Sequence, residues 1–290
     1  MKVQPFDFKR LIELAELVKE TDYAKRLEAE QDYHYEVFVE EIEELKECEG
    51  NYDEDGYAYD DIAECVHNLI FADQSRPLPK LLTDLVALIY DYAVLLQDAD
   101  MINNYGALYY SGRLGAVDYF KAEYYYSLAS NLGLDLATEN LGYIYYYGRT
   151  GKVDYAKAFM MFARGAAFDR PVSLYKLGDM YLNGYFVEKS TDTAFKLFLK
   201  AESLLEKFLE EDNDPSPDVY FRLGKCHYYG TGTDINLKKA FKYFQKAESG
   251  FMEKIAKGDH FVKELLQTTI SLEEEIRKQL IAQLPQLLQG

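Results

Sequence analysis

Apolar residues recur at helical spacing along most of the chain, and we predict no strand. Near the N-terminus, FDFKRLIELAELVKE and TDYAKRLEAEQDYHYEVFVEEIEELKE predict one short and one long helix, the second of them strongly acidic on its outer face. Near the C-terminus, DHFVKELLQTT predicts a helix, and SLEEEIRKQLIAQL predicts another, because Ser271 and Glu274 have the spacing of a capping box. The pattern therefore predicts an all-α protein.

Small residues recur at fixed spacing in the middle of the chain. Four glycines, which we number as position zero of four units, lie 36, 36 and 46 residues apart, and a second glycine follows each of them at plus six. An alanine follows each at plus sixteen. The three sets are Gly106, Gly142, Gly178 and Gly224; Gly112, Gly148, Gly184 and Gly230; and Ala122, Ala158, Ala194 and Ala240. Such self-similarity indicates a repeat protein.

Each recurring position fits a pair of packed helices. A glycine in the middle of a helix costs about 1 kcal/mol relative to alanine, so we expect the close approach of a second helix to compensate for it. Position plus twenty is aromatic and plus twenty-three is small, as in Phe162 and Gly165, which suits the contact face of that second helix. The plus-six glycine is expected to end the first helix in a left-handed conformation. Asp118, Asp154 and either Thr191 or Asp192 are expected to begin the second helix.

The units NYGALYYSGRLGAVDYFKAEYYYSLAS, NLGYIYYYGRTGKVDYAKAFMMFARGA and RLGKCHYYGTGTDINLKKAFKYFQKAESG resemble the Sel-one-like repeat (SLR) family, which is a branch of the tetratricopeptide-like proteins. The resemblance implies an α/α superhelical solenoid of stacked helix pairs with helical caps. It also implies a non-enzymatic adaptor or scaffold that uses no cofactor.

The resemblance gives a domain organisation within one continuous solenoid. Its parts are acidic N-terminal capping helices at 1–60, a degenerate first repeat at 61–98, four repeats at 99–250 and C-terminal capping helices at 251–290. In the degenerate repeat, Tyr90 and Ala93 match positions plus twenty and plus twenty-three, whereas Ile70 replaces the first glycine and Val86 the alanine. A plain pair of capping helices is the alternative there.

Charge and composition restrict the partners. The net charge of −18 lies mostly in residues 1–98, which hold 9 basic and 25 acidic residues. Phosphate backbones repel such a surface, so we expect no nucleic-acid binding. No apolar run reaches the roughly 18 residues that a membrane span needs. The three cysteines form no C-x-x-C pair, and we therefore expect a cytoplasmic protein.

Motifs for catalysis or metal binding are weak. The acidic loop Asn51–Ile62 resembles a calcium loop, but Ile62 stands where a bidentate glutamate is needed. Ser173 and Lys176 form an S-x-x-K motif, without its companion motifs, in a segment that we expect near the surface. The four histidines lack the spacing of metal ligands. We therefore predict no metal site and no enzymatic activity, with a hydrolase or penicillin-binding protein as the less favoured class.

The predicted partner is another protein or a peptide. If the first helix of each unit lines the concave side, as the resemblance implies, positions minus three, plus one, plus four and plus five form a tyrosine-rich groove. The residues at these positions are Tyr110, Tyr143, Tyr146, Tyr147, Tyr175, Asp179, Asn183, Phe221, Lys225, Tyr228 and Tyr229. The plus-four tyrosines could instead pack against the next unit. A second hypothesis is an acidic inhibitor or immunity-type protein that binds a basic partner through its N-terminal helices.

Overall fold

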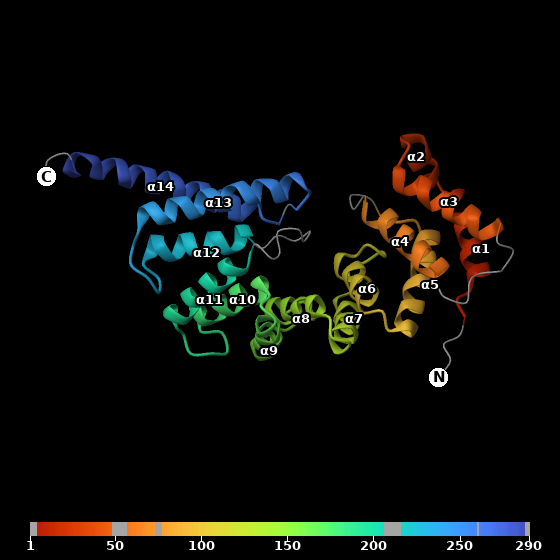
Figure 1. Cartoon of the computed structure of the whole chain (residues 1–290), viewed down its shortest axis with the longest axis horizontal. Coiled ribbons are helices and arrows are strands. Elements are labelled where there is room, and N and C mark those ends of the chain that lie inside the picture. The colour runs from red at the N-terminus through yellow and green to blue at the C-terminus, as the bar shows by residue number, and fades with distance from the viewer. Residues whose placement is uncertain (1–4, 48–56, 73–76, 206–215, 260, 288–290) are drawn as a thin grey trace. The chain divides into compact units, whose positions relative to one another are not determined.

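Every regular element that the structure describes is a helix (Figure 1). The structure is a computed structural model that describes residues 5–47, 57–72, 77–205, 216–259 and 261–287. The chain forms two compact units, Met1–Ala137 and Thr138–Gly290. The predicted all-α fold of packed helix pairs is confirmed.

The first unit is built around one apolar core. Helix α1 packs against α5 and α3, α3 against α4, and α6 against α7. Leu11, Phe38, Ile42 and Tyr90 are completely buried in this unit. Its helices are α1 (Phe8–Lys19), α2 (Asp22–Glu30), α3 (Tyr33–Glu47), α4 (Tyr57–Ala72), α5 (Lys80–Leu96), α6 (Ala99–Ser111) and α7 (Tyr119–Asn131).

The long acidic helix predicted near the N-terminus is two helices. Helix α2 ends at Gln31, whose φ of 54° is left-handed, and Asp32 begins α3 by accepting a hydrogen bond from the Tyr35 backbone N–H at 3.0 Å. The prediction of one long helix was wrong because no glycine or proline marks the break. A left-handed residue is usually glycine or asparagine, and glutamine carries no such signal.

Helices α4 and α5 are joined by buried aromatic contacts. The Tyr59 hydroxyl donates to the Ile89 carbonyl at 2.9 Å, and the Tyr90 hydroxyl lies 3.0 Å from His67 Nδ1. Tyr90 and Ala93, which match the repeat pattern in sequence, are both completely buried. The packed helices α4 and α5 suit either a degenerate repeat or a pair of capping helices. The proposed repeat at 61–98 therefore stays a prediction.

The second unit consists of successive helical hairpins. Figure 1 shows α10 against α11 and α12 against α13, with α14 alongside α13. Helix α8 (Asp135–Tyr147) begins at the end of the first unit. The others are α9 (Tyr155–Ala167), α10 (Pro171–Asn183), α11 (Thr191–Leu204), α12 (Ser216–Tyr229), α13 (Leu237–Ala256) and α14 (Lys263–Leu287).

The recurring small residues pack as the repeat pattern predicts. A Cβ atom added at Gly142 would lie 2.5 Å from the Phe162 ring, and one added at Gly224 would lie 2.7 Å from the Phe244 ring. Gly106 and Gly178 face the plus-twenty rings of their own units in the same way. The plus-sixteen alanines are completely buried. Each position-zero glycine therefore makes room for the aromatic ring of the second helix of its unit.

The predicted helix ends are confirmed except at one position. Gly112 and Gly184 end α6 and α10 in the left-handed conformation, with φ of 74° and 73°. Asp118 and Asp154 cap α7 and α9 through their side chains. Ser190, rather than Thr191 or Asp192, caps α11 by accepting from the Thr193 N–H at 3.2 Å. The three candidates are adjacent polar residues, which the sequence pattern alone does not separate.

The two helices predicted near the C-terminus are one continuous helix, α14. Ser271 does not cap a second helix, because its Oγ donates to the Gln267 carbonyl one turn earlier, at 3.0 Å. A serine hydroxyl can make this bond inside a helix without ending it. The C-terminal cap of the last repeat is therefore a single helix packed against α13.

Glu273 gives the second unit a pH-dependent stability. It is buried on α14, and burial together with the negative charge of Glu248 raises its pKa to about 7. Since the folded state favours the protonated form, stability should fall as the pH rises from the unfolded pKa of glutamate towards 7. We expect Glu273→Gln to remove this fall and to stabilise the chain by about 1–3 kcal/mol at about pH 8.

Urea unfolding of Glu273→Gln and the wild type at acidic and at mildly alkaline pH measures this difference. Glu274→Gln, at the exposed neighbouring position, is the matched control and should follow the wild type at both pH values. A Glu273→Gln variant as sensitive to alkaline pH as the wild type would show that Glu273 is ionised without penalty in the folded state.

Candidate functional site

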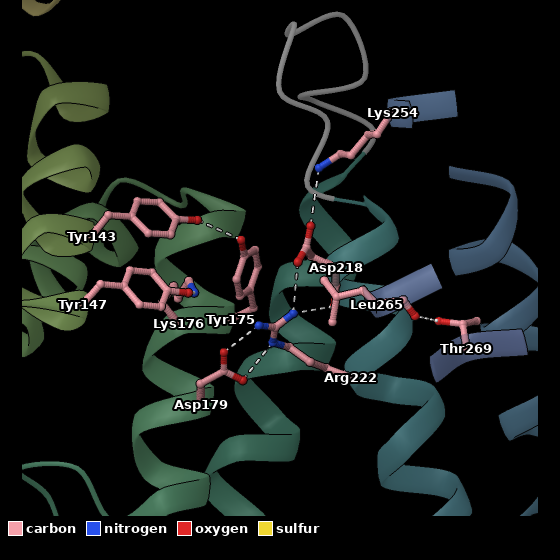
Figure 2. Close-up of polar contacts among 10 residues, drawn as sticks. All are labelled: Tyr143, Tyr147, Tyr175, Lys176, Asp179, Asp218, Arg222, Lys254, Leu265 and Thr269. Atoms are coloured by element: carbon pink, nitrogen blue, oxygen red, sulfur yellow. Dashed lines mark hydrogen bonds and ion pairs between the residues drawn. The ribbon is translucent and has the colours of Figure 1, made fainter. Parts of the chain in front are cut away.

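The first helices of the repeats contribute a shared surface in the second unit. Tyr143 of α8 and Tyr175 of α10 meet through their hydroxyls at 2.9 Å. Asp179 of α10 and Arg222 of α12 form an ion pair (Figure 2). We call this surface of α8, α10 and α12 the tyrosine face. It consists of Tyr143, Tyr147, Tyr175, Lys176, Asp179, Phe221, Arg222, Lys225 and Tyr229.

Arg222 is the centre of an ion-pair network. Its guanidinium donates to both carboxylate oxygens of Asp179, at 2.8 and 2.6 Å, and to the backbone carbonyl of Asp218 at 2.8 Å. The Asp218 carboxylate binds Arg222 through one oxygen at 3.3 Å and Lys254 of α13 through the other at 3.4 Å. Burial alone would lower the pKa of Arg222, but the Asp179 carboxylate outweighs it and holds the pKa above its usual value. The network ties α10, α12 and α13 together (Figure 2).

A pocket of about 140 Å³ lies beside this network. Leu182, Phe221 and Cys226 give it apolar walls, while Lys225 and Tyr229 lie on it as exposed side chains. Apolar walls with a few polar groups are typical of ligand-binding pockets.

Lys176 is buried among tyrosines. Its side chain is on α10, only 4% of the residue is exposed, and its Nζ donates to the Tyr147 hydroxyl at 2.8 Å. The same nitrogen lies 4.9, 5.0, 4.9 and 5.7 Å from the ring centres of Tyr143, Tyr146, Tyr147 and Tyr175. Cations are attracted to the faces of aromatic rings at such distances. We call this arrangement the lysine cage.

The buried hydroxyls of Tyr143 and Tyr175 act as neutral hydrogen-bonding groups. Burial raises the pKa of Tyr143, and burial together with the Tyr143 hydroxyl raises that of Tyr175. Arg222 stacks over the Tyr175 ring at 4.3 Å. The face therefore offers cations and neutral hydroxyls, with the Asp179 carboxylate already engaged by Arg222.

The residues predicted from the sequence to bind a partner differ in exposure. Tyr147, Asn183, Lys225 and Tyr229 are exposed, and Tyr175 and Phe221 are buried. The others, which are partly buried, are Tyr110, Tyr143, Tyr146, Asp179 and Tyr228. Tyr110 belongs to the first unit, where its ring meets that of Tyr119 at 5.1 Å.

Two plus-four tyrosines contact the next helical pair. The Tyr146 ring lies 6.1 Å from that of Tyr185, in the loop after α10, and the Tyr228 hydroxyl accepts from Gln279 of α14 at 3.2 Å. These contacts agree with the alternative that plus-four tyrosines pack between units. A partner-binding role for the predicted set stays a prediction.

Sequence reasoning did not select Arg222 or assign Lys176 to the partner surface. Both stand two residues before the position-zero glycine of their repeat, where the first two units have Asn104 and Asn140. A polar residue at this position of every unit was the available signal. Its meaning comes from contacts up to 43 residues away, such as Arg222 with Asp179.

The S-x-x-K motif does not lie near the surface, contrary to prediction. Ser173 is completely buried, and its Oγ donates to Glu139 Oε1 at 2.8 Å. Arg170 donates to the other oxygen of Glu139 at 3.1 Å. Lys176 points to the tyrosines instead (Figure 2). The prediction failed because Ser173 faces α8 and Gly165 of α9, where a serine fits only because Gly165 has no side chain.

The remaining candidate chemistry is limited. Residues 51–56 of the predicted acidic loop Asn51–Ile62, like Cys48, lie outside the described residues, and the rest of that segment belongs to α4. Within the described ranges, no three His, Cys, Asp or Glu side chains are grouped to hold a metal ion, and no helix has the length and apolarity to cross a membrane. Burial raises the pKa of the Cys65 and Cys226 thiols to about 12, which disfavours reactive thiolates.

Helix pairs packed through recurring small residues define a helical repeat protein. The Sel1 repeat family matches residues 99–134, 136–167, 171–204 and 217–249, and the chain is therefore a Sel1 repeat (SLR) protein with four repeats. Such repeats typically mediate protein interactions, and proteins of this family are usually non-catalytic scaffolds. None of the curated proteins compared with the chain matches it.

Solved structures share the fold. A protective antigen of uropathogenic Escherichia coli with an SLR fold aligns with a TM-score of 0.55 and 21% identity over 94% of this chain and 53% of the antigen. This chain thus spans about half of the antigen's length. A Sel1 repeat protein from Oxalobacter formigenes aligns with a TM-score of 0.55 and 17% identity over 86% of this chain and 98% of that one. At these identities the likeness concerns the fold alone.

Proposed function

We propose that the chain is a non-enzymatic adaptor of the cytoplasm that binds a protein segment or peptide on the tyrosine face. The observation that carries this proposal is the pocket between α10 and α12, where exposed Lys225 and Tyr229 adjoin the buried Phe221. Tyrosine and arginine are the residues most enriched where binding energy is concentrated. The cytoplasmic assignment rests on the unpaired Cys65 and Cys226.

The geometry favours an extended segment. Tyr147 of α8 and Tyr229 of α12 are 47% and 57% exposed, and α10 between them carries Lys176 and Asp179. A chain crossing the helices could place one side chain in the pocket and others against these rings. Rigid aromatic rings lose little conformational entropy on binding, which suits them to this role.

The test is selection of a fully randomised peptide display library on the immobilised chain, followed by affinity measurement with the selected peptides. We expect Tyr229→Ala to weaken binding by about tenfold or more, because it removes the largest exposed ring at the pocket. Tyr124→Ala is the matched control, since Tyr124 is 58% exposed but lies on α7, in the first unit. It should leave the affinity unchanged.

Failure of the library to enrich any peptide, or equal effects of the two variants, would contradict binding at the tyrosine face. Calorimetric titration with the same peptides gives both the affinity and the fraction of protein that binds. It therefore distinguishes weaker binding from loss of the folded state. Both variants remove exposed rings, so both are expected to unfold at the wild-type temperature.

The acidic N-terminal helices are a second candidate surface. A hollow of about 270 Å³ between α3 and α4 is lined by Glu41, Asp61 and Glu64. Burial and the neighbouring carboxylates raise the pKa of Glu41. A basic side chain would relieve this repulsion.

Charge reversal distinguishes this candidate from the tyrosine face. Glu43 is not a suitable target, because Lys19 and Lys46 bind its carboxylate at 2.7 and 2.9 Å. Glu40 and Glu47 are exposed. Loss of peptide binding in Glu40→Lys with Glu47→Lys, together with retained binding in Tyr229→Ala, would assign the function to the N-terminal helices.

A further inference from the structure

We propose that Lys176 determines the specificity of the tyrosine face, and that the bound peptide presents an acidic side chain whose carboxylate binds the Lys176 ammonium. This inference rests on the proposed function, because it names the chemistry of the segment bound there. It assigns a role to a buried cation that the architecture of the repeat does not require.

The nearby carboxylates are committed to other partners. Asp179 and Asp218 are bound by Arg222, and Glu139 is bound by Arg170 and Ser173. Lys176 forms no ion pair with any residue that the structure describes. Its one hydrogen-bond acceptor among these residues is the Tyr147 hydroxyl.

Among the described residues, the ammonium of Lys176 has one hydrogen-bond acceptor. It has three N–H donors, and one of them is used. Removing a charge from water is unfavourable unless the charge is paired and hydrogen-bonded. The faces of the four tyrosine rings stabilise the positive charge, but a ring face carries no compensating negative charge. A carboxylate would supply both the acceptors and the opposite charge.

Among the four rings of the lysine cage, that of Tyr147 is the exposed one. Tyr147 is the last residue of α8 and is 47% exposed, and its hydroxyl occupies the position of an acceptor oxygen at 2.8 Å from Nζ. Rotation of this side chain would open the lysine cage without moving a helix. The guanidinium of Arg149 also lies near Tyr147, 5.3 Å from its ring centre. Two cationic side chains, Lys176 and Arg149, therefore lie next to Tyr147.

The source of the carboxylate is a side chain rather than a chain terminus. The exposed rings of Tyr147 and Tyr229 belong to α8 and α12, with Lys176 on α10 between the two helices. A segment that contacts both rings continues past Lys176 in both directions. An aspartate or glutamate within the segment meets this geometry, whereas a terminal carboxylate would end it.

The test uses peptides selected from the randomised library on the wild-type chain. We expect the selected peptides to share an aspartate or glutamate, and we expect replacement of that residue by its amide to weaken binding about ten- to a hundredfold. Amidation of the peptide C-terminus should have no effect. Lys176→Met, which keeps an unbranched apolar chain among the rings, should bind the acidic and amide peptides equally.

Lys196→Met is the matched control, because Lys196 is an exposed lysine of α11 outside the tyrosine face. It should retain the preference for the acidic peptide. Peptides selected without a shared acidic residue, or a preference that survives Lys176→Met or disappears in Lys196→Met, would overturn the inference and leave the proposed function intact. An effect of C-terminal amidation alone would overturn the assignment to a side chain.

Two results separate the inference from folding and from the proposed function. The amide peptides are measured on the unmodified chain, so they test the carboxylate even if Lys176→Met fails to fold. Selection of no peptide at all would contradict both the inference and the proposed function, whereas selection of neutral peptides would contradict only the inference.

Discussion

Replacement of Arg222 by methionine is expected to destabilise the second unit by about 3–5 kcal/mol. The guanidinium is largely buried, with 16% of the side chain exposed, and it is bound to Asp179 and Asp218. Without it, Asp179 would lose both of its charge-assisted hydrogen bonds in a poorly hydrated position. The Tyr175 ring would also lose the cation stacked on it at 4.3 Å.

Urea unfolding followed by circular dichroism measures this loss. The double variant Asp179→Asn with Arg222→Met should be more stable than Arg222→Met alone, because the unpaired carboxylate is then neutral. Lys196→Met is the control, since it removes an exposed ion pair with Asp192 and should cost at most about 1 kcal/mol. An Arg222→Met variant as stable as the control would show that the network contributes nothing to folding.

Replacement of Phe162 by alanine is expected to destabilise the second repeat by about 3–5 kcal/mol. Its ring is completely buried and fills the space above Gly142. Gly142→Ala introduces the opposite defect, because its Cβ would lie 2.5 Å from that ring, and should cost about 1–3 kcal/mol through overpacking. The gain in helix propensity from alanine, about 1 kcal/mol, offsets part of this loss.

A double-mutant cycle tests whether the two residues act together. In Gly142→Ala with Phe162→Leu, the smaller side chain leaves room for the added methyl group. We therefore expect the two changes to cost less together than the sum of their separate costs. Phe168→Ala is the control, because Phe168 is an exposed phenylalanine just after α9. Additive costs would contradict direct contact as the reason for glycine at position zero.

The repeat could be predicted because its contacts have a fixed spacing in the sequence. Gly142 and Phe162, and the corresponding pair Gly224 and Phe244, are each twenty residues apart and meet within one hairpin. A contact within a hairpin repeats whenever the hairpin repeats, so it leaves a periodic pattern. The break between α2 and α3 at Gln31 and the continuity of α14 through Ser271 leave no periodic pattern in the sequence. The predicted helix boundaries at these two places were therefore wrong.

The candidate site was only partly predictable for the opposite reason. The positions within the repeat placed Tyr143, Tyr147, Tyr175 and Tyr229 on first helices. The same positions also included Tyr146 and Tyr228, which contact Tyr185 and Gln279 of the elements that follow. Their exposure depends on which neighbour covers them. The sequence of a single unit does not contain that neighbour.

By itself, the sequence determined that the chain is all-α, that residues 99–250 hold four helix pairs, and which small and aromatic residues join each pair. These features depend on side-chain size within one hairpin. Only the tertiary structure decided that Ser173 is buried, that Arg222 is paired with Asp179, and that Lys176 lies among four tyrosines with no ion-pair partner in the described part of the chain. Charge and solvent exposure depend on residues brought together from different repeats, and a pattern within each repeat does not specify them.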